Sequence, residues 1–376
     1  MRIAILKERH AGETRVAATP ETVKKFTGAG HEVAIETGAG LTAAVTDAAY
    51  EAAGARLGTA AATLKGADAL FAVRMPDEAT LKKLKGVLLV AHLEPHGNTA
   101  RAEALAAAGV DALAMEFVPR ITRAQAMDAL SSQANLAGYR AVIEAASLYG
   151  RAFPMMMTAA GTVAPAKTFI MGVGVAGLQA IATARRLGGI VTATDVRSAV
   201  KEQVASLGAK FIAVEDEEFK QAETAGGYAK EMSKEYQAKQ AELIAGHIAK
   251  QDIVVTTALI PGRPAPKLVS KAMVESMKPG SVIVDLAAPT GGNCELTQAD
   301  EVVEHNGVKI IGFANLPGRL AADSSALYAK NLANLLPLLV DEEGQKAPHW
   351  DDEVIQGMAL TRGGEVIHPS LTKADA

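Results

Sequence analysis

Three glycines, Gly172, Gly174 and Gly177, form a GxGxxG pattern between an apolar run and an alanine-rich stretch. The apolar run, residues 167–171, predicts a strand, and residues 178–187 predict a helix. In such a unit the first glycine permits the tight turn, the second lets the backbone approach a pyrophosphate, and the third lets helix and strand pack closely. The positive end of the helix then faces the phosphates. The pattern predicts a dinucleotide site, and a glycine-rich packing turn is the structural alternative.

An acidic residue follows this turn at the spacing that dinucleotide sites use. The next predicted strand, residues 190–194, leads into Asp195, 18 residues beyond Gly177. A carboxylate there accepts hydrogen bonds from the adenosine ribose and repels a 2′-phosphate, which favours NAD(H) over NADP(H). Arg197 could instead serve a phosphate, and Asp195 could simply cap a turn. The further side chains expected in this nucleotide site are Val175, Val196 and Leu259.

A polar segment, residues 119–133, lies next to a predicted domain boundary. It reads PRITRAQAMDALSSQ and contains two arginines, two glutamines, one aspartate and two serines. Ligand sites favour such boundaries. The alternative is a solvated loop in which Asp128 or Ser131 caps the following helix. The spacing of the residues favours neither interpretation.

Apolar runs of strand length alternate with alanine-rich helical stretches through most of the chain, which predicts a parallel α/β architecture. Toward the N-terminus, strands are predicted at residues 2–6, 32–36, 69–73 and 87–92 and within 110–118, with helices around 20–28 and 99–108. A second series of strands is predicted at residues 168–171, 190–194, 210–213, 253–256, 282–285 and 309–312.

Two long helical stretches, residues 128–149 and 324–340, bracket this second series. They predict two Rossmann-like domains with parallel sheets, joined by the two helices with a cleft between. Residues 1–130 plus 325–376 would form an N-terminal α/β domain completed by the C-terminal tail, and residues 131–324 the NAD(H)-binding domain. Three adjacent methionines, residues 155–157, are expected to pack in a core.

The composition is that of an ordinary soluble protein, with 376 residues and a formal charge of −4. No basic block with interleaved aromatics appears, so we expect no nucleic-acid partner. The lone cysteine, Cys294, excludes an internal disulfide, fits a reducing compartment and is expected to be inert. No run approaches the roughly 18–20 apolar residues that span a bilayer. The chain is therefore predicted to be cytoplasmic, without direct membrane insertion, and no metal site is predicted.

The chain resembles the alanine dehydrogenase and pyridine nucleotide transhydrogenase superfamily over essentially its whole length. The resemblance is most specific in the stretches RAQAMDALSSQANLAGYRAV, MMMTAAGTVAPAK and AETAGGYAKEM. Within the superfamily it is most similar to the NAD(H)-binding domain I, or alpha subunit, of proton-translocating transhydrogenases.

This resemblance implies roles for the polar segment. Arg120, Gln125, Asp128 and Ser131 match the family's loop against the nicotinamide and its ribose. Gln125 would fix the nicotinamide and bridge toward the second nucleotide, and Ser131 would hold the carboxamide. Arg120 and Asp128 would keep the loop in shape. In addition, Gly227 and Tyr228 match a family loop that closes over bound nucleotide.

The two branches of the superfamily do different chemistry. An amino acid dehydrogenase forms and hydrolyses an imine, so it needs proton-transferring groups and a cation for the substrate carboxylate. Arg15 and His92 match two positions of the dehydrogenase site. Ala72 stands at the position of its catalytic lysine and Pro289 at that of its catalytic aspartate. Direct hydride transfer between two nicotinamides needs orientation and close approach but no proton transfer at the reacting carbons, so the residues favour a transhydrogenase.

The expected activity is therefore that of an NAD(P)⁺ transhydrogenase, Re/Si-specific and proton-translocating. The chain would bind NAD(H) and exchange hydride with NADP(H) bound on a partner subunit. Since the sequence has no membrane-spanning run and no second nucleotide fold, a separate membrane-spanning subunit would translocate protons. The resemblance also implies a homodimer, attached peripherally to the inner membrane through its partners. The alternatives are a free-standing NAD-dependent amino acid dehydrogenase and a noncatalytic NAD-sensing protein.

Overall fold

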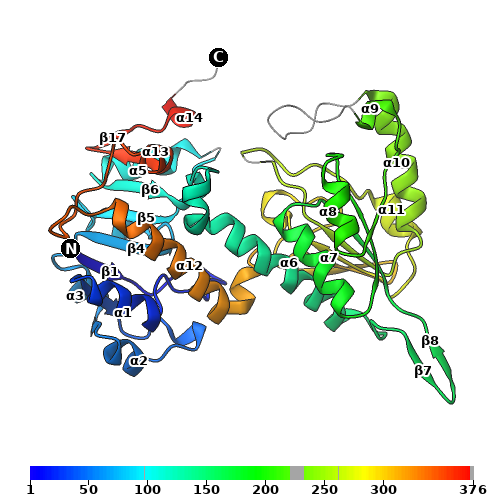
Figure 1. Ribbon diagram of the computed structural model, residues 1–376, viewed down its shortest axis with the longest axis horizontal. Coiled ribbons are helices and arrows are strands. Elements are labelled where there is room, and N and C mark those ends of the chain that lie inside the picture. The colour runs from blue at the N-terminus through cyan, green and yellow to red at the C-terminus, as the bar shows by residue number, and fades with distance from the viewer. Residues whose placement is uncertain (97, 221–232, 261, 373–376) are drawn as a thin grey trace. The chain divides into compact units, whose positions relative to one another are not determined.

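The computed structural model describes residues 1–96, 98–220, 233–260 and 262–372 (Figure 1). The chain divides into two compact units. The first unit contains Met1–Gln133 and Pro317–Ala376, and the second contains Ala134–Leu316. The sequence predicts these divisions after residues 130 and 324. Helix α6 (Ala129–Leu148) begins in the first unit and continues into the second.

The first unit is built on an eight-stranded sheet. Its strands are β1 (Arg2–Ile5), β2 (Glu32–Glu36), β3 (Arg56–Gly58), β4 (Ala69–Arg74), β5 (Leu88–His92), β6 (Asp111–Ala114), β16 (Ala359–Arg362) and β17 (Glu365–Val366). They are arranged in the order β17-β16-β6-β5-β4-β1-β2-β3, parallel from β6 to β3 and antiparallel at β16 and β17. Numbered along the chain, the six parallel strands follow the Rossmann order 3-2-1-4-5-6. Its ligands therefore belong at the carboxyl ends of β1 and β4, where the order reverses.

Helices and 3-10 turns complete the first unit. They are α1 (Pro20–Gly28), η1 (Leu41–Ala43), α2 (Asp47–Ala52), α3 (Ala60–Leu64), α4 (Glu78–Leu81), α5 (Thr99–Ala107), η2 (Met115–Phe117), η3 (Thr122–Met127), η5 (Pro317–Leu320), α12 (Ala321–Leu335), η6 (Leu336–Leu338), α13 (Glu353–Met358) and α14 (Pro369–Thr372). The predicted helix 324–340 is too long at its C-terminal end. Pro337 has no backbone N–H to continue the helix, so α12 ends at Leu335 and a 3-10 turn follows.

The second unit has a seven-stranded sheet in the order β11-β10-β9-β12-β13-β15-β14. Its strands are β9 (Lys167–Met171), β10 (Ile190–Thr194), β11 (Lys210–Phe211), β12 (Ile253–Thr256), β13 (Val282–Asp285), β14 (Val302–His305) and β15 (Val308–Ile311). Only β14 is antiparallel among these, and the parallel strands again follow the order 3-2-1-4-5-6. The prediction of two Rossmann-like α/β domains is confirmed.

The remaining elements of the second unit are helices and a hairpin. The helices are α7 (Val175–Arg186), α8 (Val200–Ser206), α9 (Glu217–Lys220), α10 (Lys234–Ile248), α11 (Lys271–Ser276) and the 3-10 turn η4 (Ala288–Thr290). The hairpin β7 (Met156–Thr158) and β8 (Gly161–Val163) projects from the body of the unit (Figure 1). The prediction that its methionines pack in a core is wrong. Met155, Met156 and Met157 are 59%, 43% and 79% exposed, because the two strands form a separate small sheet.

Across the described residues, no helix combines the length and apolar character that crossing a membrane requires. The same residues contain no cluster of three or more histidine, cysteine or acidic side chains suited to a metal ion. Cys294 is fully buried, and burial raises the pKa of its thiol, as expected of an unreactive cysteine.

Candidate functional site

The glycine turn of the second unit connects β9 to α7 and has the geometry that the sequence predicted. Gly172 has φ +102°, a conformation that favours glycine, and a Cβ there would lie 2.4 Å from Oγ1 of Thr257. A Cβ on Gly177 would lie 1.9 Å from the carbonyl oxygen of Gly172, so a side chain would force the helix away from the strand. Both glycines are needed for the turn to close.

The first turn of α7 is open in the way that a pyrophosphate requires. Within the described structure, Gly174 caps the helix without a side-chain hydrogen bond, and a Cβ placed on it would meet no atom within 4 Å. The backbone N–H groups at the start of α7 therefore face free space. A twelve-residue helix with an uncapped N-terminus after a glycine turn fits a dinucleotide phosphate.

Asp195 follows β10 and braces the glycine turn. Its carboxylate accepts hydrogen bonds from the backbone N–H of Val173 (2.7 Å) and of Arg197 (2.9 Å). The guanidinium of Arg197 also donates to it from Nε (2.9 Å) and from Nη2 (3.1 Å). The side chain of Asp195 is 7% exposed. The sequence did not predict these contacts, which place the carboxylate and its arginine at the carboxyl end of the sheet.

Apolar side chains lie exposed at the same edge. Val175, Val196 and Leu259 are 40%, 62% and 56% exposed. They follow β9, β10 and β12, which are neighbours in the parallel sheet, so all three lie at its carboxyl edge. Ile260, which the sequence analysis did not consider, is also 45% exposed there. Gly227 and Tyr228 lie outside the described residues.

Two polar residues that the sequence analysis missed support this edge. The hydroxyl of Thr257 donates to the carbonyl oxygen of Gly172 (3.1 Å), which ties the loop after β12 to the glycine turn. The fully buried Asn293 accepts from the N–H of Ala258 (3.0 Å) and donates to the carbonyl oxygens of Ala258 and Pro266 (both 2.8 Å). A buried asparagine is visible in the sequence, but nothing there shows which backbone groups it reaches.

The polar segment of the first unit forms η3 and the start of α6. Gln125 lies on η3 with its side chain exposed. Asp128 caps α6, since its Oδ1 accepts from the N–H of Ser131 (2.9 Å) and its Oδ2 from the hydroxyl of the same residue (2.5 Å). Arg120 is exposed and, within the described part of the chain, makes no ion pair with Asp128. Asp128 thus shapes this loop as a helix cap, whereas the arginine that forms ion pairs is Arg123.

The two residues that match the dehydrogenase site are committed to other contacts. Arg15 is 5% exposed and donates to Glu13 from Nε (2.8 Å) and Nη2 (2.7 Å), and to Gln133 from Nη1 (2.9 Å). Burial opposes the charge of Glu13, but the hydrogen bond from Arg15 outweighs it and lowers the pKa of Glu13 to about 2. His92 stacks on Tyr328 with ring centroids 5.2 Å apart. An arginine with every side-chain direction occupied offers no clamp for a substrate carboxylate.

The positions expected to lack the catalytic lysine and aspartate carry no proton-transferring side chain. Ala72 is buried, and its carbonyl oxygen accepts from Tyr328. Pro289 lies in η4. The neighbouring carboxylate, Asp285, is fully buried and accepts four hydrogen bonds, from Oγ1 of Thr256, N of Ala287, N of Cys294 and Oγ1 of Thr297.

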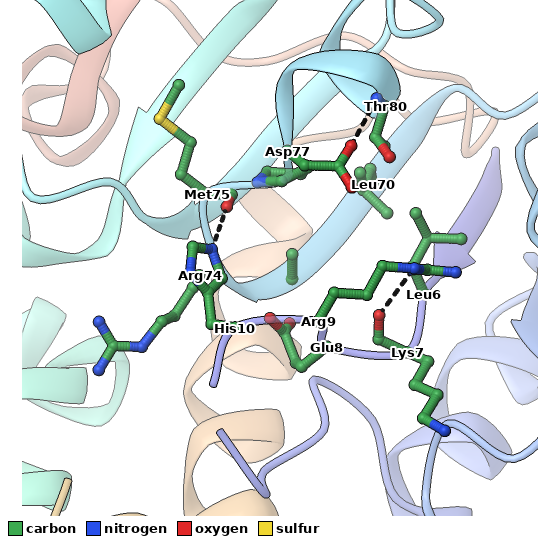
Figure 2. A pocket seen from close by; sticks show the side chains of 12 residues that line it. Leu6, Lys7, Glu8, Arg9, His10, Leu70, Arg74, Met75, Asp77 and Thr80 are labelled. Atoms are coloured by element: carbon green, nitrogen blue, oxygen red, sulfur yellow. Dashed lines mark hydrogen bonds between the residues drawn. The ribbon is translucent and has the colours of Figure 1, made fainter. Parts of the chain in front are cut away.

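A cavity of about 170 Å³ lies at the carboxyl ends of β1 and β4, lined by residues 6–10 and by residues within 70–80 (Figure 2). Its buried polar group is the carboxyl of Glu8, which accepts from the N–H of Val73 (2.6 Å). Arg74 lines the cavity but pairs with Glu13 and Glu94. Burial opposes its charge, yet the hydrogen bond to Glu13 prevails and raises the pKa of Arg74. A guanidinium so held cannot act as a general acid or base.

Glu8 gives a prediction about pH and stability. Burial raises the pKa of its carboxyl from 4.5 to about 7. Between these values the unfolded chain loses the proton first, so stability falls as the pH rises and the cost is complete above pH 7. We expect Glu8→Gln to raise the free energy of unfolding at pH 8 by up to about 3 kcal/mol, and by much less at pH 5. Urea unfolding at both values measures this.

The exposed Glu51 supplies the control, since Glu51→Gln should change stability equally little at both values. Glu13 has the opposite sign, because its lowered pKa gives stability that is lost only as the pH falls from 4.5 through about 2. It does not contribute between pH 5 and 8. An equal effect of Glu8→Gln at pH 5 and pH 8 would contradict the assignment.

Comparison with known proteins agrees with this architecture. The family models "Alanine dehydrogenase/PNT, N-terminal domain" and "Alanine dehydrogenase/PNT, C-terminal domain" match residues 4–137 and 141–369. An NAD(P) transhydrogenase subunit alpha chain of Rhodospirillum rubrum is 55% identical over 99% of both chains. NAD(P) transhydrogenase subunit alpha of Haemophilus influenzae is 48% identical, covering 100% of this chain and 73% of that protein.

Solved structures and more distant relatives extend the comparison. The crystal structure of transhydrogenase from Sinorhizobium meliloti has a TM-score of 0.90 and 55% identity, covering 98% of this chain and 100% of that one. Alanine dehydrogenase of Methanococcus maripaludis is 33% identical, over 100% of this chain and 96% of that protein. The resemblance inferred from the sequence is confirmed, and the chain belongs to the alanine dehydrogenase/PNT family.

Proposed function

We propose that this protein is the NAD(H)-binding subunit of a proton-translocating NAD(P) transhydrogenase. Hydride would pass directly between C4 of its nicotinamide and C4 of the nicotinamide of NADP(H) on a partner subunit. The observation that carries the proposal is the 55% identity, over 99% of both chains, to a transhydrogenase alpha subunit. The relatives that are alanine dehydrogenases are more distant, at 33% identity.

The polar groups of the first unit support direct hydride transfer. Arg15 and Arg74 carry permanent charges that carboxylates already neutralise. Neither can exchange a proton with an amino acid substrate. Hydride transfer between two nicotinamides has no such requirement, because its barrier is lowered mainly by orientation and close approach. The absence of a proton-transferring group at Ala72 and Pro289 is what this reaction tolerates and an amino acid dehydrogenase does not.

NAD(H) would be held by the second unit. The uncapped start of α7 would bind the pyrophosphate, with Gly172, Gly174 and Gly177 keeping side chains out of the way. Asp195 would accept from the ribose hydroxyls. Val175, Val196 and Leu259 would contact the nucleotide through their exposed apolar surface, and Gly227 and Tyr228 would close over it.

The polar loop of the first unit would meet the reacting end of the cofactor. We propose that the carboxamide of Gln125 contacts the nicotinamide and that Ser131 holds the carboxamide of the cofactor. Asp128 would orient the hydroxyl of Ser131, to which it is already hydrogen-bonded. Arg120 has no partner among the described residues, which leaves its guanidinium available to the bound nucleotide.

Asp195 should determine the preference for NAD(H). The isosteric change Asp195→Asn keeps an acceptor for the N–H of Val173 but removes the charge that neutralises Arg197. We expect about tenfold weaker binding of NADH and at least tenfold tighter binding of NADPH, since Arg197 becomes available to a 2′-phosphate. Titration of both nucleotides by fluorescence measures this. Arg197→Ala should not improve NADPH binding, and an unchanged ratio in Asp195→Asn would refute the assignment.

We further propose that the chain forms a homodimer and attaches to the inner membrane through an NADP(H)-binding and a membrane-spanning subunit. The exposed methionines of the β7–β8 hairpin support contact with a second copy, because a projecting apolar surface of this kind is unusual on a monomer.

Reconstitution tests the proposed function. The protein is combined with candidate NADP(H)-binding and membrane subunits, and reduction by NADPH is followed with an NAD analogue whose reduced form absorbs at a different wavelength. Activity that needs all the subunits supports the proposal. Rapid NAD reduction by the isolated protein with alanine, lysine or glutamate would instead identify an amino acid dehydrogenase. NAD binding with neither activity would indicate a noncatalytic role.

A further inference from the structure

The loop that carries Gln125 is held by residues from the far end of the chain. The guanidinium of Arg123 donates to both oxygens of Asp352, from Nη1 (3.0 Å) and Nη2 (2.9 Å), and from Nε to Glu353 (3.2 Å). We call Arg123, Asp352 and Glu353 the Arg123 cluster. Its members are more than 200 residues apart in sequence, yet all belong to the first unit.

The acidic side of the Arg123 cluster is itself fixed. Asp352 is the N-cap of α13, and its Oδ1 accepts from the N–H of Val354 (2.8 Å). Val354 and Ile355 are buried in the core, so α13 is a firm support. The hydrogen bond from Arg123 lowers the pKa of Asp352, which keeps the carboxylate charged.

The other end of η3 is held by α12. The carbonyl oxygen of Ala126 accepts from Nδ2 of Asn331 (2.9 Å) and from Nδ2 of Asn334 (3.0 Å). Between these attachments, Ala124 is fully buried. The residue that remains exposed between Ala124 and Ala126 is Gln125, and its backbone is fixed on both sides.

We propose that Asp352 and Glu353, acting through Arg123, are positioning residues that set where Gln125 meets the nicotinamide. This inference rests on the proposed function, since it assumes that Gln125 touches the reacting cofactor. The ion pairs are exposed, with side-chain exposures of 45% for Arg123, 22% for Asp352 and 63% for Glu353. Exposed pairs contribute little to stability. A two-point contact on a short loop, however, fixes orientation, to which hydride transfer is sensitive.

The test uses single-turnover hydride transfer in the reconstituted complex. Arg123→Ala removes the cation, and Asp352→Asn removes the charge while preserving a helix cap. We expect each to slow hydride transfer about fivefold to tenfold, with the KM for NADH and the melting temperature nearly unchanged. Arg123→Lys should give an intermediate rate, because lysine keeps the charge but loses the fork geometry. The double variant Arg123→Ala/Asp352→Asn should be no slower than either single variant, since both remove the same contact.

A second readout is independent of activity. Trp350 is the only tryptophan in the chain and lies two residues before Asp352, stacked against the guanidinium of Arg362. Its fluorescence should change in Arg123→Ala if the cluster connects η3 to this segment. Lys82→Ala, which breaks the exposed pair with Glu78 in the same unit, is the matched control and should change neither readout.

The outcomes separate the two proposals. If Gln125→Asn slows hydride transfer while Arg123→Ala and Asp352→Asn match the wild type, the positioning role is wrong and the proposed function stands. If Gln125→Asn is itself without effect, both the role of Gln125 and the positioning inference fail. If Lys82→Ala slows the reaction as much as the cluster variants, the effect is general and the inference is also wrong.

Discussion

Replacement of Gln125 by asparagine is expected to slow single-turnover hydride transfer about a hundredfold while changing NADH affinity by less than about threefold. The carboxamide is retained, but it is withdrawn toward η3 by one carbon–carbon bond, about 1.5 Å. A misplacement of about 1 Å at a reacting centre can cost about a hundredfold in rate. Affinity should persist because the glycine turn and Asp195 of the second unit bind the rest of the dinucleotide. Stopped-flow measurement in the reconstituted complex gives the rate, and fluorescence titration gives the affinity.

Thr122 provides the control for this prediction. It is exposed at the start of the same 3-10 turn, so Thr122→Ser should leave the rate unchanged. NADH deuterated at C4 adds a second check. A larger isotope effect is expected in Gln125→Asn because hydride transfer becomes more fully rate-limiting. A wild-type rate in Gln125→Asn would show that the side chain does not position the nicotinamide.

The glycines of the turn are expected to separate folding from nucleotide binding. In Gly177→Ala the new methyl would lie 1.9 Å from the carbonyl oxygen of Gly172, and neither backbone can yield without moving α7 from β9. We expect a loss of about 3–5 kcal/mol in the free energy of unfolding, together with loss of NADH binding. Urea unfolding and NADH titration measure the two effects.

Gly174→Ala should behave in the opposite way. Its φ of −82° suits any residue, and the methyl meets no described atom within 4 Å, so stability should change by less than about 0.5 kcal/mol. The methyl would nevertheless occupy the space in front of the α7 N-terminus and weaken NADH binding by at least about tenfold. If Gly174→Ala binds NADH normally, the pyrophosphate does not approach the turn there.

Much of the second unit could be predicted from the sequence because its signals are local. Strands predicted at residues 190–194, 253–256 and 282–285 coincide with β10, β12 and β13. Buried parallel strands appear as continuous apolar runs, and the glycine turn is defined by residues that are adjacent in the chain. The methionine run is misjudged for the same reason. Its composition indicates an apolar environment, but whether a hairpin packs or projects depends on the rest of the fold.

The sequence by itself determined the glycine turn, the two series of strands and the family, and so the proposal that NAD(H) is bound. Only the tertiary structure decided how the polar residues pair. Arg123 rather than Arg120 takes part in ion pairs, and Arg15 contacts Gln133, 118 positions away. Likewise, Gly138 on α6 is required because a Cβ there would lie 2.0 Å from the carbonyl oxygen of Ala176. Spacing along a strand or helix fixes which residues share a face, whereas contacts between distant segments depend on how those faces are packed.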